Sequence, residues 1–272
     1  MKIDLTEIAG FPCFFNPKTL DIRANDKYGI STKDRYASDL KKVWKFPDKS
    51  GDNQIAYRTA VLDKMPNEIQ SVMDKFDLIY SFVIMPALQI GGEFVKTAGH
   101  YHETMPGQPF GYPEVYMQIY GTQYLLLQKP NPENAGSIID AAIIEMTPGS
   151  IVEIPPDYAH VIINSSAEST LLAGLYNHSF RPLYDSIRTQ RGLAYYILSE
   201  EDEIRIDQNP SYQNPSVLRH ISNVKGTLYD PPQKGLPLWT SFLRNPEIYA
   251  FLTDPDAASQ RYNQTYLKKK YE

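Results

Sequence analysis

Three of the chain's five histidines stand in one pattern with a carboxylate, and this pattern constrains the fold more than any other feature. The pattern runs His100, Tyr101, His102, then Glu114, then His160. Alternate residues of a strand point to the same face, so His100 and His102 can bind one ion together. Three neutral imidazoles and one carboxylate suit a first-row divalent metal and leave room for water or substrate. The pattern therefore indicates a metal-centred site inside a β-barrel.

Turn residues at fixed distances from these ligands support the same interpretation. Gly121 follows Glu114, and the second half of the pattern runs Gly149, Pro155, Asp157, His160 and Asn164. This two-part arrangement resembles the signature of the cupin superfamily. A lone pair of alternating histidines occurs on many surface strands, but agreement between independent elements raises a motif above chance.

The sequence departs from the cupin signature at three positions. Phe94 stands where the first glycine would fall, and Asp157 replaces the glycine before the last histidine. Aspartate adopts a left-handed turn more readily than most residues, so the turn is expected to persist. The interval 103–113 is longer than usual and rich in proline and glycine, which predicts a loop at the mouth of the site. Glu103 is the alternative carboxylate if Glu114 is an ordinary strand residue.

The composition excludes several classes of partner. The chain has 272 residues, 42% of them hydrophobic, which is enough for a sizeable core. Its net charge is -5 and its only long basic run is 268–270, so no nucleic-acid partner is expected. No apolar run approaches the ~18 residues of a membrane span, and no signal peptide is expected. Cys13 is the only cysteine, which fits a reducing compartment and predicts a cytoplasmic protein with no membrane partner.

Short strands at regular spacing dominate the middle of the chain. Turns with proline and glycine separate apolar or alternating segments, and strands are expected at 55–62, 78–85, 94–102, 114–120, 123–128, 141–146, 151–154, 160–164 and 170–176. The segments 94–102 and 114–120 are expected to pair. Apolar residues at helical spacing predict a helix over 32–44. The predicted fold class is all-β, a cupin jelly-roll barrel with a short N-terminal helix and a C-terminal extension.

Three segments are expected along the chain. Residues 1–54 form N-terminal strands and a helix packed on the barrel, residues 55–208 form the barrel with the metal site, and residues 209–272 form an extended arm. The arm is rich in proline, and it carries apolar side chains that need burial, among them Trp239, Phe242 and Phe251. We expect a homodimer in which the arm crosses the two-fold axis. The alternative is an arm that folds back on its own barrel.

Four strings around the ligands carry a more specific resemblance. They run Thr97-Ala-Gly-His-Tyr-His102, Pro113-Glu-Val-Tyr116, Leu125-Leu-Leu-Gln128 and Pro155-Pro-Asp-Tyr-Ala-His160. These strings closely resemble the cupin-type glucose-6-phosphate isomerases first known from archaea, over roughly residues 12–212. The resemblance implies reversible conversion of glucose 6-phosphate to fructose 6-phosphate, so that the partner of the protein is a small sugar phosphate.

The resemblance also implies roles at the metal. The ligands would be His100, His102, Glu114 and His160, holding one divalent first-row ion, with Fe2+ as the first candidate and Mn, Zn, Co or Ni as the others. Glu114 either stays on the metal or acts as the base that moves hydrogen between C1 and C2. A metal-assisted hydride shift is the alternative mechanism. Tyr116, two residues after Glu114, faces the same side and is expected to contact the sugar.

The phosphate is expected to lie away from the metal. By resemblance, it would be held by Tyr57, Thr97, Gly99, Tyr176 and Tyr184. Hydroxyls and amides can bind phosphate without formal charge if enough of them converge. Lys96 is the only lysine or arginine near the paired histidines, and Ser81 is a further candidate contact. His178 and His220 fall outside the pattern and are expected on the surface or in ordinary packing.

Two other functions fit a metal-centred cupin barrel, since fold alone does not name a reaction. A dioxygenase would use the same four ligands with open positions for oxygen. A non-catalytic sugar-phosphate-binding protein would suit the long C-terminal arm and the enlarged loop 103–113. Oxygen consumption would identify the first, and tight binding of sugar phosphates without turnover would identify the second.

Overall fold

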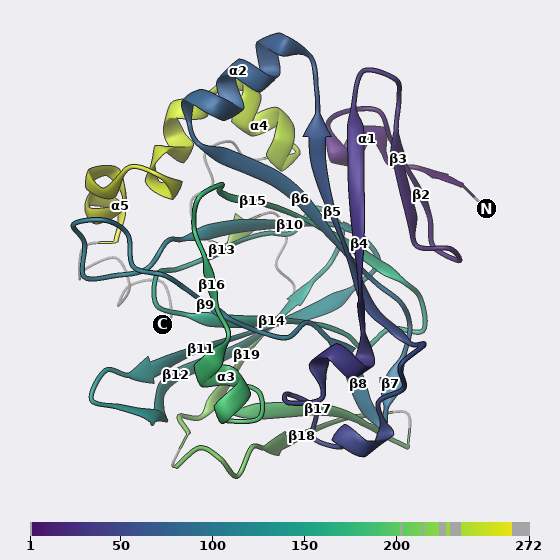
Figure 1. Ribbon diagram of the computed structural model, residues 1–272, viewed down its shortest axis with the longest axis vertical. Helices are drawn as coiled ribbons and strands as arrows, with labels where there is room; N and C mark the ends of the chain where they lie inside the picture. Colours follow the sequence, from purple (N-terminus) through teal and green to yellow (C-terminus); the bar gives the residue numbers. More distant parts are fainter. Residues whose placement is uncertain (1, 202, 214, 223–226, 229–234, 263–272) are drawn as a thin grey trace.

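Two large, curled β-sheets face each other in the computed structural model, which describes residues 2–201, 203–213, 215–222, 227–228 and 235–262 (Figure 1). The first sheet has the strand order β20 (Thr227–Leu228), β13 (Ile151–Ile154), β10 (Glu114–Tyr120), β15 (Thr170–Asn177), β6 (Leu78–Met85), β5 (Ile55–Lys64) and β4 (Gly29–Tyr36). The second has the order β18 (Glu203–Gln208), β17 (Tyr195–Glu200), β8 (Glu93–Lys96), β14 (Ala159–Asn164), β11 (Gln123–Asn131), β12 (Asn134–Met146) and β19 (Leu218–Ile221), with β7 (Gln89–Ile90) paired to β8. The predicted all-β jelly-roll class is confirmed.

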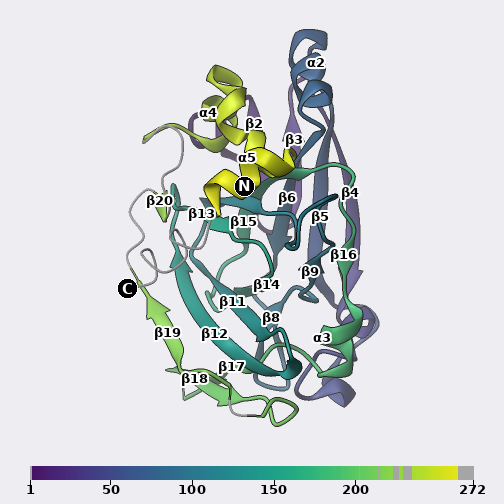
Figure 2. The same cartoon turned by 90° about the vertical axis from the view of Figure 1, so that its left-hand side faces the viewer.

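Smaller elements cover the outside of the two sheets (Figure 2). A three-stranded sheet contains β1 (Ile3–Asp4), β2 (Cys13–Asn16) and β3 (Asp21–Ala24), and β9 (Tyr101–His102) pairs with β16 (Pro182–Leu183). The α-helices are α1 (Thr6–Ala9), α2 (Asn67–Lys75), α3 (Asp185–Thr189), α4 (Leu238–Arg244) and α5 (Pro255–Arg261). The 3-10 helices are η1 (Ala37–Leu40), η2 (Pro47–Lys49) and η3 (Pro246–Leu252). Within the described residues, no helix has the length and apolar character needed to cross a membrane.

The first sheet separates two hydrophobic cores. Alternate side chains of a strand point to opposite faces, and β6 shows the consequence. Tyr80, Phe82 and Ile84 pack into a core outside the barrel, whereas Ser81 and Val83 face the space between the two large sheets. Both faces of β6 are therefore covered, which explains its continuous apolar sequence.

Cys13 belongs to the outer core. Its side chain is fully buried among the N-terminal strands, and burial raises the pKa of the thiol to about 12. The thiolate is the reactive form of cysteine, so this thiol is inert at neutral pH and its role is packing.

The helix predicted over 32–44 is wrong. Residues 29–36 form β4, which pairs antiparallel with β5, and η1 follows it. Pairing with β5 satisfies the backbone of a β-branched segment and outweighs its helical spacing of apolar residues. Trp44 is nevertheless buried, and its indole N–H donates to the Ala37 carbonyl at 2.8 Å. The short N-terminal α-helix is instead α1.

The predicted pairing of 94–102 with 114–120 is also wrong. β8 and β9 occupy part of the first segment, and β10 coincides with the second, but β8 pairs with β14 whereas β10 lies between β13 and β15. The two segments thus lie in different sheets. Strand partners that are distant in sequence cannot be read from local spacing, because register and pairing depend on the tertiary packing of each face.

The C-terminal segment folds back on its own barrel. It contributes β19 and β20 to the two large sheets, then α4, η3 and α5, where the sequence predicted an extended arm (Figure 1). Arg261 of α5 donates to the Glu153 carboxylate of β13 at 2.7 Å. The three aromatic side chains expected at a dimer contact are buried within this chain: Trp239, Phe242 and Phe251.

Replacing Trp239 tests how much this return of the chain stabilises the fold. Its side chain is 0% exposed, and its ring centroid lies 4.8 Å from that of Tyr80 and 5.8 Å from that of Phe11. We expect Trp239→Ala to lower the free energy of unfolding by about 3–5 kcal/mol, measured by denaturant unfolding. Val217, 86% exposed, provides the control, since its change to alanine should stay within about 0.5 kcal/mol. Equal effects of the two changes would contradict burial of the indole.

Candidate metal centre and substrate pocket

The four predicted ligands come from three places in the fold. His102 ends β9, and His100 forms an isolated β-bridge with His160 of β14. Glu114 is the first residue of β10, in the opposite sheet. The packing of the two sheets therefore brings the carboxylate next to the imidazoles.

The four side chains form one compact cluster. Each offers one ligand atom, and these atoms lie within 4.8 Å of one another. Glu114 Oε2 lies 3.4 Å from His102 Nε2 and 3.5 Å from His160 Nε2. The His100 ring centroid is 4.4 Å from that of His160. The spacing suits four donors to a single ion.

Neighbouring groups fix two of the imidazoles. His102 Nδ1 lies 2.7 Å from the Tyr112 carbonyl oxygen. A carbonyl only accepts, so Nδ1 carries the hydrogen and Nε2 keeps its lone pair toward the cluster. The Tyr116 hydroxyl lies 3.0 Å from His160 Nε2 and can donate to it. The carbonyl partner holds His102 in the tautomer and orientation that a metal ligand needs. The Tyr116 hydroxyl instead contacts the His160 nitrogen that faces the cluster, so a bound metal would displace this contact.

The protonation states also suit a metal. Burial lowers the pKa of His100 and His160 well below the ordinary value, and the neighbouring histidines lower it further. Burial raises the pKa of the Glu114 carboxyl, while the neighbouring His102 opposes that rise. His102 Nε2 and Glu114 Oε2 are buried without a hydrogen-bond partner in the described protein. Buried polar atoms are costly unless satisfied, and a divalent cation bound between them would satisfy both.

The turn and loop expected around the cluster are present. Asp157 has φ 68, in the left-handed region, and its Oδ1 accepts from the Gly111 N–H at 3.0 Å. This bond ties the interval 103–113 to the turn before His160. Glu103 lies outside the cluster, where its carboxylate accepts from the Arg181 N–H at 2.8 Å. The carboxylate in the cluster is therefore Glu114.

A cavity of about 370 Å³ opens beside the cluster. Residues of both large sheets line it, so its walls are set by the packing of one sheet on the other. The cavity is lined by all seven residues predicted to bind or react with substrate: Tyr57, Thr97, Gly99, Glu114, Tyr116, Tyr176 and Tyr184. His100 and His160 of the cluster line it as well. His102 lies behind them.

Comparison with known proteins identifies the family. The family model described as glucose-6-phosphate isomerase (GPI) matches residues 34–214. The chain belongs to the glucose-6-phosphate isomerase family. The match includes all four clustered side chains and the whole set of predicted substrate residues.

Relatives among the glucose-6-phosphate isomerases come from archaea. The enzyme of Thermococcus litoralis is 28% identical over 185 residues, covering 66% of this chain and 86% of that protein. That of Pyrococcus abyssi is 30% identical over 138 residues, covering 51% of this chain and 66% of that protein. Among solved structures, vicilin from Corylus avellana (hazelnut) gives a TM-score of 0.36 at 10% identity over 60% of this chain and 35% of that chain. This last similarity is too low to support an argument.

In this isomerase-family pocket the hydroxyl groups are protonated donors. Burial raises the pKa of Tyr57 and of Tyr176 to about 12, so both phenols keep their hydrogens at neutral pH. Tyr176 pairs with Glu114 across β15 and β10, and it therefore stands beside the carboxylate on the same face. The Thr97 hydroxyl oxygen accepts from the Ile162 N–H at 3.1 Å, which leaves its own hydrogen for a ligand.

Two glycines let the walls of the pocket approach closely. Gly99 has φ 73, and a Cβ there would lie 2.5 Å from Val161 Cγ2. A Cβ on Gly174 would lie 3.1 Å from Glu114 Oε1 and 3.0 Å from the Tyr116 ring. Gly174 was not predicted, because a glycine within an apolar strand carries no local sign that the Glu114 carboxylate packs against it.

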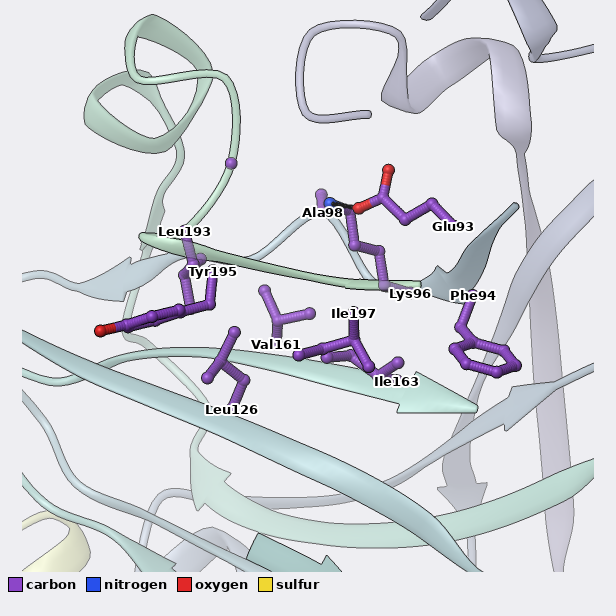
Figure 3. Close-up of a pocket in the computed structure, with 11 residues that line it drawn as sticks. Glu93, Phe94, Lys96, Ala98, Leu126, Val161, Ile163, Leu193, Tyr195 and Ile197 are labelled. Atoms are coloured by element: carbon purple, nitrogen blue, oxygen red, sulfur yellow. Dashed lines mark hydrogen bonds and ion pairs between the residues drawn. The ribbon is translucent and has the colours of Figure 1, made fainter. Parts of the chain in front are cut away.

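Lys96 does not reach the pocket. Figure 3 shows its amino group joined to the Glu93 carboxylate above a packed layer that includes Val161 and Ile197. This pair is buried, and the Lys96 amino group also lies 5.0 Å from the centroid of the Tyr196 ring. The adjacent cavity has a volume of about 10 Å³, too small for a sugar. Lys96 therefore anchors β8 and contributes no charge to the pocket.

Phe180 was not predicted. It lies between β15 and β16, lines the pocket, and has its ring centroid 4.2 Å from that of His102. Nothing local distinguishes it from other aromatic residues of the chain. Ser81 lines the pocket, as the sequence suggested. His178 reaches the rim with an exposed side chain, and His220 is exposed on β19.

Proposed function

We propose that this protein interconverts glucose 6-phosphate and fructose 6-phosphate at the cluster formed by His100, His102, Glu114 and His160. The observation that carries the proposal is one cavity that joins this cluster to protonated hydroxyl groups suited to a sugar phosphate. Membership of the glucose-6-phosphate isomerase family supports the same reaction. The reaction belongs to glycolysis and gluconeogenesis.

The cluster fits a divalent first-row metal, with Fe2+ as our first candidate. Such a metal would be held by the three imidazoles, and by Glu114 while that carboxylate is not acting as the base, and it would supply Lewis-acid stabilisation of negative charge on the sugar oxygens. Glu114 acts as the base: it takes the proton from C2 of glucose 6-phosphate and returns it to C1. Isomerisation also moves the hydroxyl proton of the sugar from O2 to O1. Tyr116, whose hydroxyl lies 3.0 Å from His160 Nε2, contacts the sugar hydroxyls during this step.

The remaining pocket residues bind and orient the substrate. Thr97 and the phenols of Tyr57, Tyr176 and Tyr184 donate hydrogen bonds to the sugar or its phosphate, and the backbone at Gly99 approaches closely because no side chain intervenes. Phe180 covers the His102 ring and keeps water from that side of the cluster.

A coupled assay tests the proposed reaction. Purified protein supplied with fructose 6-phosphate should form glucose 6-phosphate, detected through its oxidation by an added dehydrogenase. We expect turnover well above that of a matched sample in which His160 is replaced by alanine. Absence of turnover with binding of sugar phosphates would indicate a binding protein. Oxygen uptake in place of isomerisation would indicate a dioxygenase.

We further propose a cytoplasmic homodimer in which residues 55–208 carry the chemistry. The single, buried Cys13 suits a reducing compartment. Residues 1–54 would support the barrel through β4, and residues 209–272 would support it through β19 and α4. The C-terminal aromatic side chains are buried within their own chain, so a two-fold contact would have to use another surface, such as an exposed sheet edge.

A further inference from the structure

The substrate pocket lacks a counter-charge for a phosphate. Of the described residues that line it, none is lysine or arginine, and its only carboxylate is Glu114. A phosphate dianion that leaves water for such a cavity loses hydration, and neutral hydroxyls replace it only in part. The chain as a whole carries a net charge of -5, which also repels the substrate. Positive charge close to the pocket would therefore improve both binding and capture.

Arg35 lies next to Tyr57, a residue of the pocket wall. It lies on β4, the edge strand of the first sheet, and is directly paired with Tyr57 of β5. Directly opposed residues of an antiparallel pair share a face of the sheet, so Arg35 lies on the face that Tyr57 presents to the pocket. The side chain is half-buried, and no ion pair links it to a carboxylate among the described residues.

Arg188 lies next to Tyr184, another residue of the pocket wall. It lies on α3, and its guanidinium carbon is 5.0 Å from the centroid of the Tyr184 ring, which lines the pocket. Its ion pair with Asp185 spans 3.8 Å between side chains that are 48% and 102% exposed, respectively. Exposed pairs of this kind are weak, so the guanidinium is free to bind an anion. Arg188 of α3 and residues of η1, which follows β4, line one groove.

The positive charges of Arg35 and Arg188 both affect the Tyr184 hydroxyl. Burial raises the pKa of Tyr184, and the charges of Arg35 and Arg188 oppose that rise. The nearest acidic group of η1 is Asp39, whose carboxylate accepts from the Tyr36 N–H at 2.9 Å. It lines the groove that Arg188 also lines, together with Lys41 and Lys42. The four cationic side chains Arg35, Arg188, Lys41 and Lys42 thus outnumber the carboxylates of Asp39 and Asp185 here.

We propose that Arg35 and Arg188 form a cationic rim that binds the phosphate of the sugar phosphate and directs the reacting carbons toward the metal cluster. The proposal rests on the proposed function, which supplies the phosphorylated substrate. The two guanidiniums bind the phosphate near Tyr184, and the hydroxyls of the pocket complete its hydrogen bonds. Arginine suits this role because its planar fork matches phosphate oxygens.

The test removes each charge and leaves a shorter, neutral polar side chain in its place. Arg35→Gln and Arg188→Gln are each expected to raise KM for fructose 6-phosphate, and the inhibition constant of inorganic phosphate, by about tenfold with kcat little changed. The double variant should show a larger rise and a weaker dependence of kcat/KM on ionic strength. Arg23→Gln removes an equal charge from an exposed position on β3 and should change neither constant.

Binding of inorganic phosphate, measured by calorimetry, separates this proposal from the proposed function. If the wild-type chain binds phosphate more tightly than the double variant but isomerises no sugar, the rim is supported and the function is wrong. If both single variants bind phosphate and fructose 6-phosphate as the wild type does, the rim is overturned. Arg188 is half exposed, so Arg188→Gln is expected to fold and decides the question even if Arg35→Gln does not.

Discussion

Glu114→Gln is expected to lower the isomerase kcat by about 10²–10⁴-fold. An amide has nearly the shape of a carboxylate but cannot take a proton from C2, so the variant should keep its fold and its three imidazole ligands. Glu114 Oε2 lies within 3.5 Å of His160 Nε2, so the metal content of the variant must be measured beside its rate. A variant that keeps its metal and loses its rate identifies the base.

Glu103→Gln is the matched control for this change. It removes the same charge from the loop beside the site, where the side chain accepts from the Arg181 N–H and an amide oxygen can still accept. Its rate should stay close to that of the wild type.

A second readout separates the base mechanism from the hydride shift. This readout is the conversion of glucose 6-phosphate to fructose 6-phosphate in deuterium oxide. A base exchanges part of the transferred hydrogen with solvent, whereas a hydride shift leaves the fructose 6-phosphate unlabelled at C1. Near-normal turnover of Glu114→Gln, without label, would favour the hydride shift.

Removal of the metal is expected to lower activity by about a thousandfold or more, because the loss of several kcal/mol of charge stabilisation falls on the rate-limiting barrier. Chelation should produce a protein that elemental analysis shows to be metal-free. Addition of Fe2+, Mn, Zn, Co or Ni should then restore activity to different degrees. The four donors lie within 4.8 Å of one another, and two of their atoms are buried without a partner, so the site is already arranged to rebind an ion.

Stability provides a check that does not depend on turnover. A metal that binds only the folded chain should raise its unfolding temperature, and the shift should vanish in a His102→Ala variant. Full activity of protein proven to be metal-free would contradict a catalytic metal. Activity lost on chelation and restored without any gain in stability would indicate that the ion binds elsewhere, for example to the substrate.

Several features could be predicted because they depend on local periodicity. The alternation of His100 and His102, and that of Glu114 and Tyr116, is a property of extended backbone and holds in any sheet. The left-handed turn at Asp157 follows from the conformational preference of that residue, and the structure has it at φ 68. Segments such as 114–120 and 151–154 were predicted with the bounds that β10 and β13 have. The four side chains that cluster and the barrel class could thus be predicted from the amino-acid sequence.

Other features depended on which surfaces meet, and only the tertiary structure decided them. Residues 29–36 form a strand because the edge of β5 offers backbone partners, and no local pattern reports that edge. The C-terminal aromatics could be assigned to burial but not to a partner, since the hydrophobic effect has no direction; the core around Tyr80 accommodates Trp239 within the same chain. Arg35 and Arg188 are 153 positions apart in the sequence, that is 188 − 35. The pairing of β4 with β5 and the position of α3 bring both arginines close to residues of one pocket. Only long-range contacts can do this, because local spacing in the sequence does not report which distant segments meet.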